Sequence, residues 1–132
     1  MSRVTEMKAK DYLINRFHHA QYKFSDNEGE SGFDLWMENV ETEHRSKIEL
    51  KATEGFYSRQ SDIFQKLYFS AENEVINFQS GNTQMLRVFL GNQPPKLFLM
   101  DKTILDNGAK FESEFRAKII GPKNYHRIKE IQ

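Results

Sequence analysis

The sequence predicts a single domain of mixed α/β (α+β) type, with helices flanking a mixed central sheet. Two observations predict this fold. Apolar residues near the N-terminus recur at helical spacing, and several later runs alternate or are rich in aromatic residues, as in strands. Their order along the chain is helix, two or three strands, helix, two strands. The 132 residues are 38% hydrophobic, with eleven Phe, which is enough material for one buried core.

The first half of the chain begins with an amphipathic segment in which Leu13 and Phe17 lie on one helical stripe with Glu6 and Lys10. Polar and glycine-bearing stretches mark loops, and alternating residues mark strands. We therefore expect, in order, a helix from 3 to about 20, a loop at 22–31, a strand at 33–37, a turn region at 38–46, a strand at 47–52 and a loop at 53–62.

The second half contains a helix that Ser70 would cap, with Glu72 favourable in its first turn. A single long helix over 62–79 is an alternative that the pattern leaves open. Otherwise we expect, in order, a strand at 66–69, a helix at 71–79, a hairpin of strands 84–90 and 96–100, a short helix near 101–105 and an extended segment at 115–120.

Composition excludes several classes of protein. The chain has no cysteine, which rules out disulfides and thiolate metal sites. It has no apolar run of about 18 residues, so we expect no membrane span. Its start lacks the apolar stretch of a secretory signal, so we expect a cytoplasmic location.

The charges balance overall but are unevenly spread. Nineteen basic and nineteen acidic residues give a net charge of zero, which is unusual for a free-standing nucleic-acid binder. The segment 26–43 carries seven acids and no Lys or Arg, whereas a basic C-terminal tail at about 115–132 carries five basic residues and one acid. The two segments suit metal and phosphate binding respectively, or they are a solvated loop and a solvated tail.

Two short motifs carry the functional argument. Asp34 lies within Gly-Phe-Asp-Leu-Trp at 32–36, and Glu49 and Lys51 lie within Ile-Glu-Leu-Lys at 48–51. Residues two apart on a strand share a face, so Glu49 and Lys51 point together while Leu50 points away. An Asp and a Glu-x-Lys on neighbouring strands can hold Mg²⁺ against a phosphodiester. Taken alone, the same residues also fit a strand cap and an exposed cross-strand charge pattern.

The combination of these motifs resembles the PD-(D/E)xK restriction-endonuclease-like superfamily. The segment Phe-Ser-Ala-Glu-Asn-Glu at 69–74, followed by Met-Leu-Arg-Val-Phe at 85–89, is similar to the NO VEIN-type C-terminal domain family. The resemblance covers roughly residues 4–101. The proline of the superfamily name is absent, and Phe33 precedes Asp34 instead.

The resemblance implies a restriction-endonuclease-like core and a Mg²⁺-dependent nuclease, with Mn²⁺ as a substitute ion. Asp34, Glu49 and the backbone carbonyl of Leu50 would be metal ligands, Lys51 the catalytic lysine, and Glu6 the acid of the first helix beside the metal. DNA would be the substrate, with RNA left open, in a defence or repair setting. A homodimer or a larger protein partner would be expected. The alternative is a catalytically inactive module of the same fold that acts as an interaction subunit.

Three further residues have two interpretations each. Gln65 and Glu74 are either extra contacts of the site or ordinary surface residues. Trp36 is two residues from Asp34 and either stacks on a base or packs in the protein.

Overall fold

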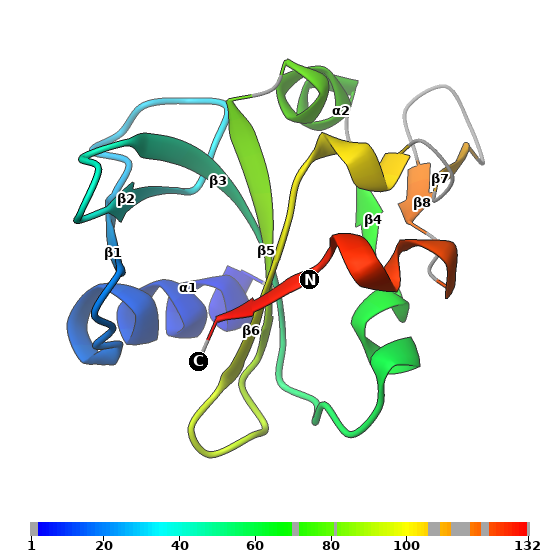
Figure 1. Cartoon of the computed structure of the whole chain (residues 1–132), viewed down its shortest axis with the longest axis horizontal. Helices are drawn as coiled ribbons and strands as arrows, with labels where there is room; N and C mark the ends of the chain where they lie inside the picture. The colour runs from blue at the N-terminus through cyan, green and yellow to red at the C-terminus, as the bar shows by residue number, and fades with distance from the viewer. Residues whose placement is uncertain are drawn as a thin grey trace.

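A computed structural model gives the fold of residues 3–69, 72–80, 82–105, 109–111, 117–119 and 122–131. Its centre is a six-stranded mixed sheet in the order β1-β2-β3-β5-β6-β9 (Figure 1). The strands of this sheet are β1 (Tyr22–Asp26), β2 (Leu35–Asn39), β3 (Arg45–Thr53), β5 (Thr83–Phe89), β6 (Lys96–Met100) and β9 (Lys129–Ile131).

Strands β3 and β5 are parallel, and the other neighbouring pairs are antiparallel. Their register places Glu49 beside Met85 and Lys51 beside Arg87. The chain between the two parallel strands carries η2 (Gln60–Phe64), β4 (Tyr68–Phe69) and α2 (Glu72–Gln79). β4 belongs to a second, three-stranded sheet with β8 (Ala117–Ile119) and β7 (Ala109–Phe111).

Helices lie on both faces of the large sheet. α1 (Arg3–Asp11) continues into the π-helical turn η1 (Tyr12–Arg16), and buries Ala9 and Leu13 against Leu50 and other residues of one face. α2 buries Phe78 in a second cluster on the opposite face. Two further short 3₁₀ helices are η3 (Lys102–Ile104) and η4 (Pro122–Arg127). Because side chains alternate along β3, Ile48, Leu50 and Ala52 face α1, whereas Glu49 and Lys51 face the α2 side.

Much of the predicted fold is confirmed. The mixed sheet has helices on both faces, the strand expected at 47–52 is β3, and the helix expected at 71–79 is α2. The predicted hairpin is formed by β5 and β6. The first helix ends at Arg16 instead of near 20, and the strand expected at 33–37 begins at Leu35. The short helix near 101–105 is η3. Ser70, the expected cap of α2, lies outside the described residues.

Two expectations are wrong. The loop predicted at 22–31 contains β1, which pairs with β2 because Tyr22 and Phe24 alternate with polar residues and enter the core. The alternative of one long helix over 62–79 is excluded, because η2 and β4 precede α2.

The C-terminal segment is not simply a solvated tail. Its described parts form β8, η4 and β9, and β9 pairs with β6 at the edge of the large sheet. None of the helices within the described ranges has the length and apolar character needed to cross a bilayer.

Candidate functional site

Asp34 is fixed at the point where β2 meets β3. Its N–H donates to the carbonyl oxygen of Ile48 at 2.8 Å, and its carboxylate Oδ2 accepts from the N–H of Leu50 at 2.8 Å. The side chain of Asp34 therefore accepts the hydrogen bond that the next main-chain carbonyl of β2 would accept if the β2–β3 pairing continued. Since the N–H and C=O of one residue point to the same side of a strand, the carbonyl of Leu50 also faces this edge.

Glu49 and Lys51 share the face of β3 opposite Leu50, as predicted, and both are buried at 8% and 9% exposure. The Nζ of Lys51 lies 3.4 Å from Oε1 of Glu49 and 3.5 Å from Oε2 of Glu74 on α2. The interpretation as an exposed cross-strand charge pattern is therefore wrong. Glu74 is a partner of the site lysine and not an ordinary surface residue.

Glu6 reaches the same group of side chains from α1. It is half-buried, and its carboxyl is hydrogen-bonded to that of Asp34. Burial raises the pKa of Glu6 to about 7, and the hydrogen bond and the negative charge of Asp34 add to the effect. A proton shared between the two carboxyl groups explains how they can approach each other.

The pKa of Glu49 is raised for similar reasons. Burial raises its pKa to about 8, with a further increase from the charge of Asp34, although Lys51 opposes the shift. Glu49 and Glu74 thus contact the ammonium of Lys51, while Asp34 interacts with Glu49 and with Glu6. When all four carboxyl groups are ionised their charge exceeds that of Lys51, so the cluster favours a bound proton or an added cation.

Asp34 and Glu49 line one hollow of about 380 Å³. Its wall includes the loop before β2 and one side of α2, and the other lining residues are Glu30, Ser31, Gly32, Phe33, Asn73, Glu74 and Asn77. Asn77 donates from Nδ2 to the carbonyl of Gly32 at 3.0 Å, which ties the loop to α2. Gly32 has a φ of +91°, a conformation that favours glycine.

The oxygen atoms that line this hollow, together with the neighbouring carbonyl of Leu50, suit a hard divalent cation. Mg²⁺ and Mn²⁺ prefer oxygen ligands, and the carboxylates of Asp34 and Glu49 with the carbonyl of Leu50 are of that type. Lys51 holds one oxygen of Glu49, and Leu50 holds one oxygen of Asp34. Among the residues with described positions, no three His, Cys, Asp or Glu side chains form a ready metal-binding group. A metal here would use water and the carboxylate oxygens that Leu50 and Lys51 do not hold, and it would compete with Glu6 for Asp34.

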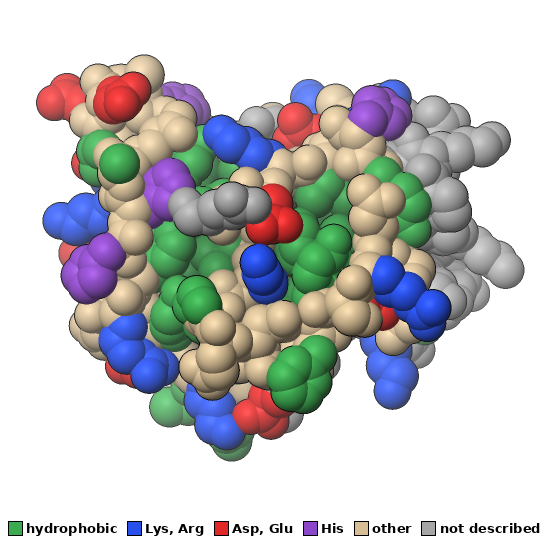
Figure 2. All heavy atoms as spheres, turned by 60° about the horizontal axis from the view of Figure 1, so that its bottom comes forward, with side chains coloured by type: hydrophobic (Ala, Val, Ile, Leu, Met, Phe, Trp, Pro, Cys, Tyr) green, Lys and Arg blue, Asp and Glu red, His purple; other side chains and the backbone are tan. Residues whose placement is uncertain are grey.

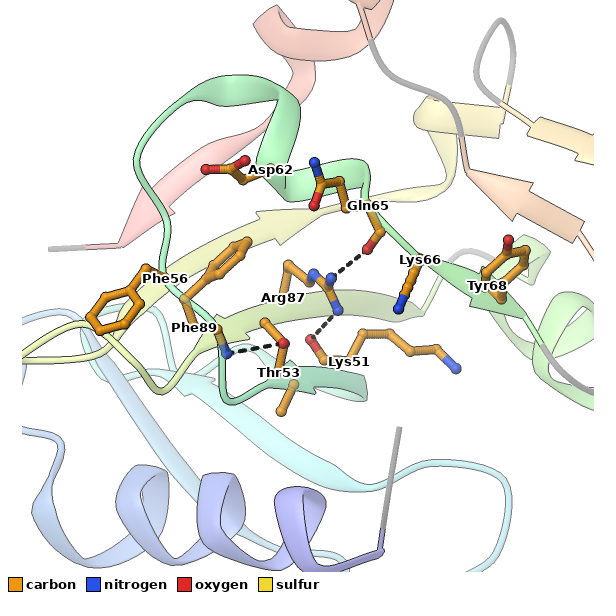
Figure 3. Close-up of a pocket in the computed structure, with 11 residues that line it drawn as sticks. Lys51, Thr53, Phe56, Asp62, Gln65, Lys66, Tyr68, Arg87 and Phe89 are labelled. Carbon is orange, nitrogen blue, oxygen red and sulfur yellow. Dashed lines mark hydrogen bonds between the residues drawn. The ribbon is translucent and has the colours of Figure 1, made fainter.

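A second hollow, of about 450 Å³, lies on the other side of Lys51 (Figure 3). Its most unusual lining residue is Arg87 of β5, which is only 6% exposed. Arg87 was not among the site residues predicted from the sequence. The available signal was a charged residue in the middle of the apolar run Met-Leu-Arg-Val-Phe.

The remaining candidates have structural contacts. The ring of Trp36 is half-buried, packs edge-to-face on Phe33 at 4.8 Å between centroids and lies under the guanidinium of Arg45 at 4.1 Å. Gln65 contributes its main-chain carbonyl, which accepts from Arg87 at 2.7 Å.

Comparisons with known proteins identified no relative of this chain. No protein-family model matches the chain, and neither a curated protein nor a solved structure matches it.

Proposed function

We propose that the protein is a metal-dependent nuclease with a restriction-endonuclease-like core that hydrolyses DNA phosphodiester bonds. One observation carries the proposal: Asp34 and Glu49 line the same hollow, and the buried ammonium of Lys51 lies beside Glu49. The order α1, β1, β2, β3, α2, β5, with β3 and β5 parallel, supports the fold assignment. The resemblance shares the first helix, the two motif strands, the following helix and the next strand of this order, whereas β1 was expected to be a loop.

Asp34, Glu49 and the carbonyl of Leu50 would hold the Mg²⁺ or Mn²⁺ ion. A bound ion would polarise a phosphate oxygen and lower the pKa of a bound water. The chain's own contribution is positional. Leu50 fixes the Asp34 carboxylate through its N–H, and Glu49 and Glu74 hold the ammonium of Lys51 on the site face. From there Lys51 can donate to an oxygen of the phosphate and stabilise charge that develops during the reaction.

Glu6 offers a place for a proton. Its pKa is raised to about 7, so near neutral pH it exchanges between its two protonation states. Its hydrogen bond to Asp34 places this exchange at the edge of the hollow.

The second candidate function is a catalytically inactive interaction module of the same fold. It is favoured by the net charge of zero and by the pairing of Lys51 with Glu49 and Glu74. On the face seen in Figure 2, basic and acidic side chains are interspersed and form no broad basic surface.

Nicking of supercoiled plasmid DNA separates the two functions. We expect cleavage that requires Mg²⁺ or Mn²⁺ and is lost, by about 100-fold or more, in Asp34→Asn and Lys51→Ala. Lys23→Ala, which removes an exposed charge on β1, is the control and should cleave as wild type. Linear duplex, single-stranded DNA and RNA are tested in parallel.

The result that overturns the nuclease proposal is specific. Purified protein would cleave none of these substrates with either ion, and calorimetry would detect no binding of Mg²⁺ or Mn²⁺. That outcome favours the interaction module.

A further inference from the structure

Arg87 is a buried cation without a counter-anion among the described residues. It is 6% exposed in the middle of β5, between β3 and β6. One terminal nitrogen donates to the carbonyl of Gln65 at 2.7 Å, and the other makes a long contact of 3.4 Å with the carbonyl of Lys51. Its Nε donates to no group within the described part of the chain, where no ion pair to Arg87 is formed either. Burial lowers its pKa only to about 10, so it stays cationic at neutral pH.

Asp62, the one acid among the described lining residues of this hollow, forms no ion pair with Arg87. Asp62 accepts hydrogen bonds at Oδ2 from the N–H groups of Ser58 and Arg59 and from the hydroxyl of Ser58. In Figure 3 its carboxylate points away from Arg87. Arg87 also has a cation–π contact with the ring of Phe89, 5.3 Å from the guanidinium carbon to the ring centroid. None of these contacts supplies a negative charge, and an uncompensated buried charge costs several kcal/mol in general, so its presence needs a further explanation.

A second cation faces the same hollow. Lys66 is exposed, forms no ion pair with any residue of the described ranges, and has a φ of +51°, in the left-handed region. Figure 3 shows its ammonium directed into the hollow beside Arg87. The guanidinium and the ammonium therefore converge on one concave space, which suits an oxyanion such as phosphate.

The rim carries an aromatic ring that is open to solvent. Phe56 lines the hollow and is 73% exposed, the most exposed of the large hydrophobic side chains in the described part of the chain. In Figure 3 this ring lies at the end of the hollow away from Lys66. Single-strand nucleic-acid sites combine a cationic groove with exposed aromatic rings, so that bases stack while phosphates of the strand are neutralised. A free phosphate ion would not use such a ring.

We propose that this hollow is a nucleotide subsite, in which Arg87 and Lys66 bind a phosphate group of a nucleic-acid strand and Phe56 stacks on its base. Lys51 connects the two hollows, because its main chain contacts Arg87 and its ammonium faces Glu49 and Glu74. The strand would thus pass from this subsite to the neighbouring phosphodiester at Asp34 and Glu49, and this last placement rests on the proposed nuclease function.

The subsite is tested by binding of 5′-phosphorylated tetrathymidylate in EDTA, measured by calorimetry. Removing a hydrogen-bonded cation should weaken binding roughly tenfold to a hundredfold in Arg87→Met, and severalfold in Lys66→Gln and Phe56→Ala. Lys23→Gln removes one exposed charge outside the hollow and should bind as wild type. The same oligonucleotide without its 5′-phosphate distinguishes a terminal phosphate from an internal one: equal affinity identifies the internal group.

Thermal unfolding accompanies each variant. Because Arg87→Met removes an unpaired buried charge, we expect it to fold and to melt at or above the wild-type temperature. If that variant fails to fold, the exposed positions Lys66 and Phe56 decide the question. Wild-type affinity in Arg87→Met together with a lowered melting temperature would mean that Arg87 only supports the chain around Gln65, and would overturn the proposal. So would wild-type affinity in both Lys66→Gln and Phe56→Ala.

The outcome does not depend on cleavage. Binding in EDTA that requires Arg87, in a protein that cuts no substrate, keeps the subsite and rejects the nuclease. Metal-dependent cleavage with an unchanged KM in Arg87→Met keeps the nuclease and rejects the subsite.

Discussion

At the scale of single residues, Asp34 has two separable roles. Its charge contributes to the carboxylate cluster, and its Oδ2 accepts the N–H of Leu50 at 2.8 Å. The N–H of Leu50 points toward the side of β3 on which β2 lies. Because the pairing of β2 with β3 begins at Leu35 and Ile48, β2 offers no main-chain acceptor to this N–H, and the side chain of Asp34 accepts from it instead.

Comparing two substitutions at this position isolates the hydrogen bond. Asp34→Asn and Asp34→Ala both remove the charge, but only Asn keeps an oxygen that can accept from Leu50. We expect Asp34→Ala to be less stable than Asp34→Asn by about 1–3 kcal/mol in urea unfolding, which is the cost of leaving the buried N–H of Leu50 unpaired. Equal stability of the two variants would contradict this role for the carboxylate.

The residues of the site differ in how readily sequence predicts them. The shared face of Glu49 and Lys51 follows from the two-residue period of a strand, and β3 confirms it. Glu74 and Arg87 depend on contacts between distant segments. Arg87 reaches the site because β5 runs parallel to β3 in a register that pairs it with Lys51. No local pattern specifies that register.

At the scale of elements, β1 shows why one strand was missed. Asp26 and the polar, glycine-bearing residues that follow it are typical of a loop, and they obscured the alternation of Tyr22 and Phe24 with Lys23 and Ser25. β1 is also an edge strand, so pairing with β2 on one side is enough to form it. The signals for β3, α2 and the β5–β6 hairpin were stronger, because those elements bury longer apolar runs.

The turn between β5 and β6 fixes the loop that borders the second hollow. The N–H of Gly91 donates to the carbonyl of Gly55 at 3.0 Å. Asn92 accepts from the N–H of Tyr57 at 2.7 Å and donates to its carbonyl at 3.1 Å. These contacts hold the segment after β3 against the hairpin.

Gly91 has no room for a side chain. A Cβ at this position would lie 2.5 Å from the carbonyl oxygen of Gly55, a main-chain atom that cannot rotate away. We therefore expect Gly91→Ala to separate the loop from the hairpin and to lower the free energy of unfolding by about 1–3 kcal/mol. Urea unfolding measures the change.

Gly55→Ala is the matched control for this prediction. A Cβ at Gly55 would lie 3.5 Å from the hydroxyl oxygen of Thr53, an ordinary contact distance. Its stability should stay within about 0.5 kcal/mol of wild type or rise slightly, because alanine restricts the unfolded chain. A Gly91→Ala protein as stable as Gly55→Ala would show that the loop is not held by this contact.

At the scale of the whole molecule, the charge is distributed to act locally. A net charge of zero provides no general attraction for nucleic acid. Lys51 is paired with Glu49. Arg87 and Lys66, which line the second hollow, have no carboxylate partner among the described residues. Any nucleic-acid affinity would then come from a few directed contacts and not from a broad basic surface.

The carboxylate cluster should also make global stability depend on pH. The pKa values of Glu6 and Glu49 are raised from about 4.5 to about 7 and about 8 in the folded protein. Between pH 4.5 and 8 the folded state therefore binds more protons than the unfolded state, and its stability falls as the pH rises. With respect to these groups, we expect the metal-free protein to be most stable below about pH 4.5, to be close to that maximum at pH 5, and to lose on the order of a few kcal/mol by pH 9.

Denaturant unfolding in EDTA at pH 5, 7 and 9 measures this fall. Glu49→Gln should match wild type near pH 5, where Glu49 is largely protonated, and exceed it at pH 9, where ionised Glu49 adds repulsion to Asp34 and Glu74. Glu41→Gln, in an exposed turn, should follow the wild-type curve. Millimolar Mg²⁺ should restore stability at pH 9 in wild type but much less in Glu49→Gln, because a bound cation replaces the missing protons. A flat profile in wild type, unaffected by Mg²⁺, would mean that the carboxylates are too far apart to share a proton or an ion.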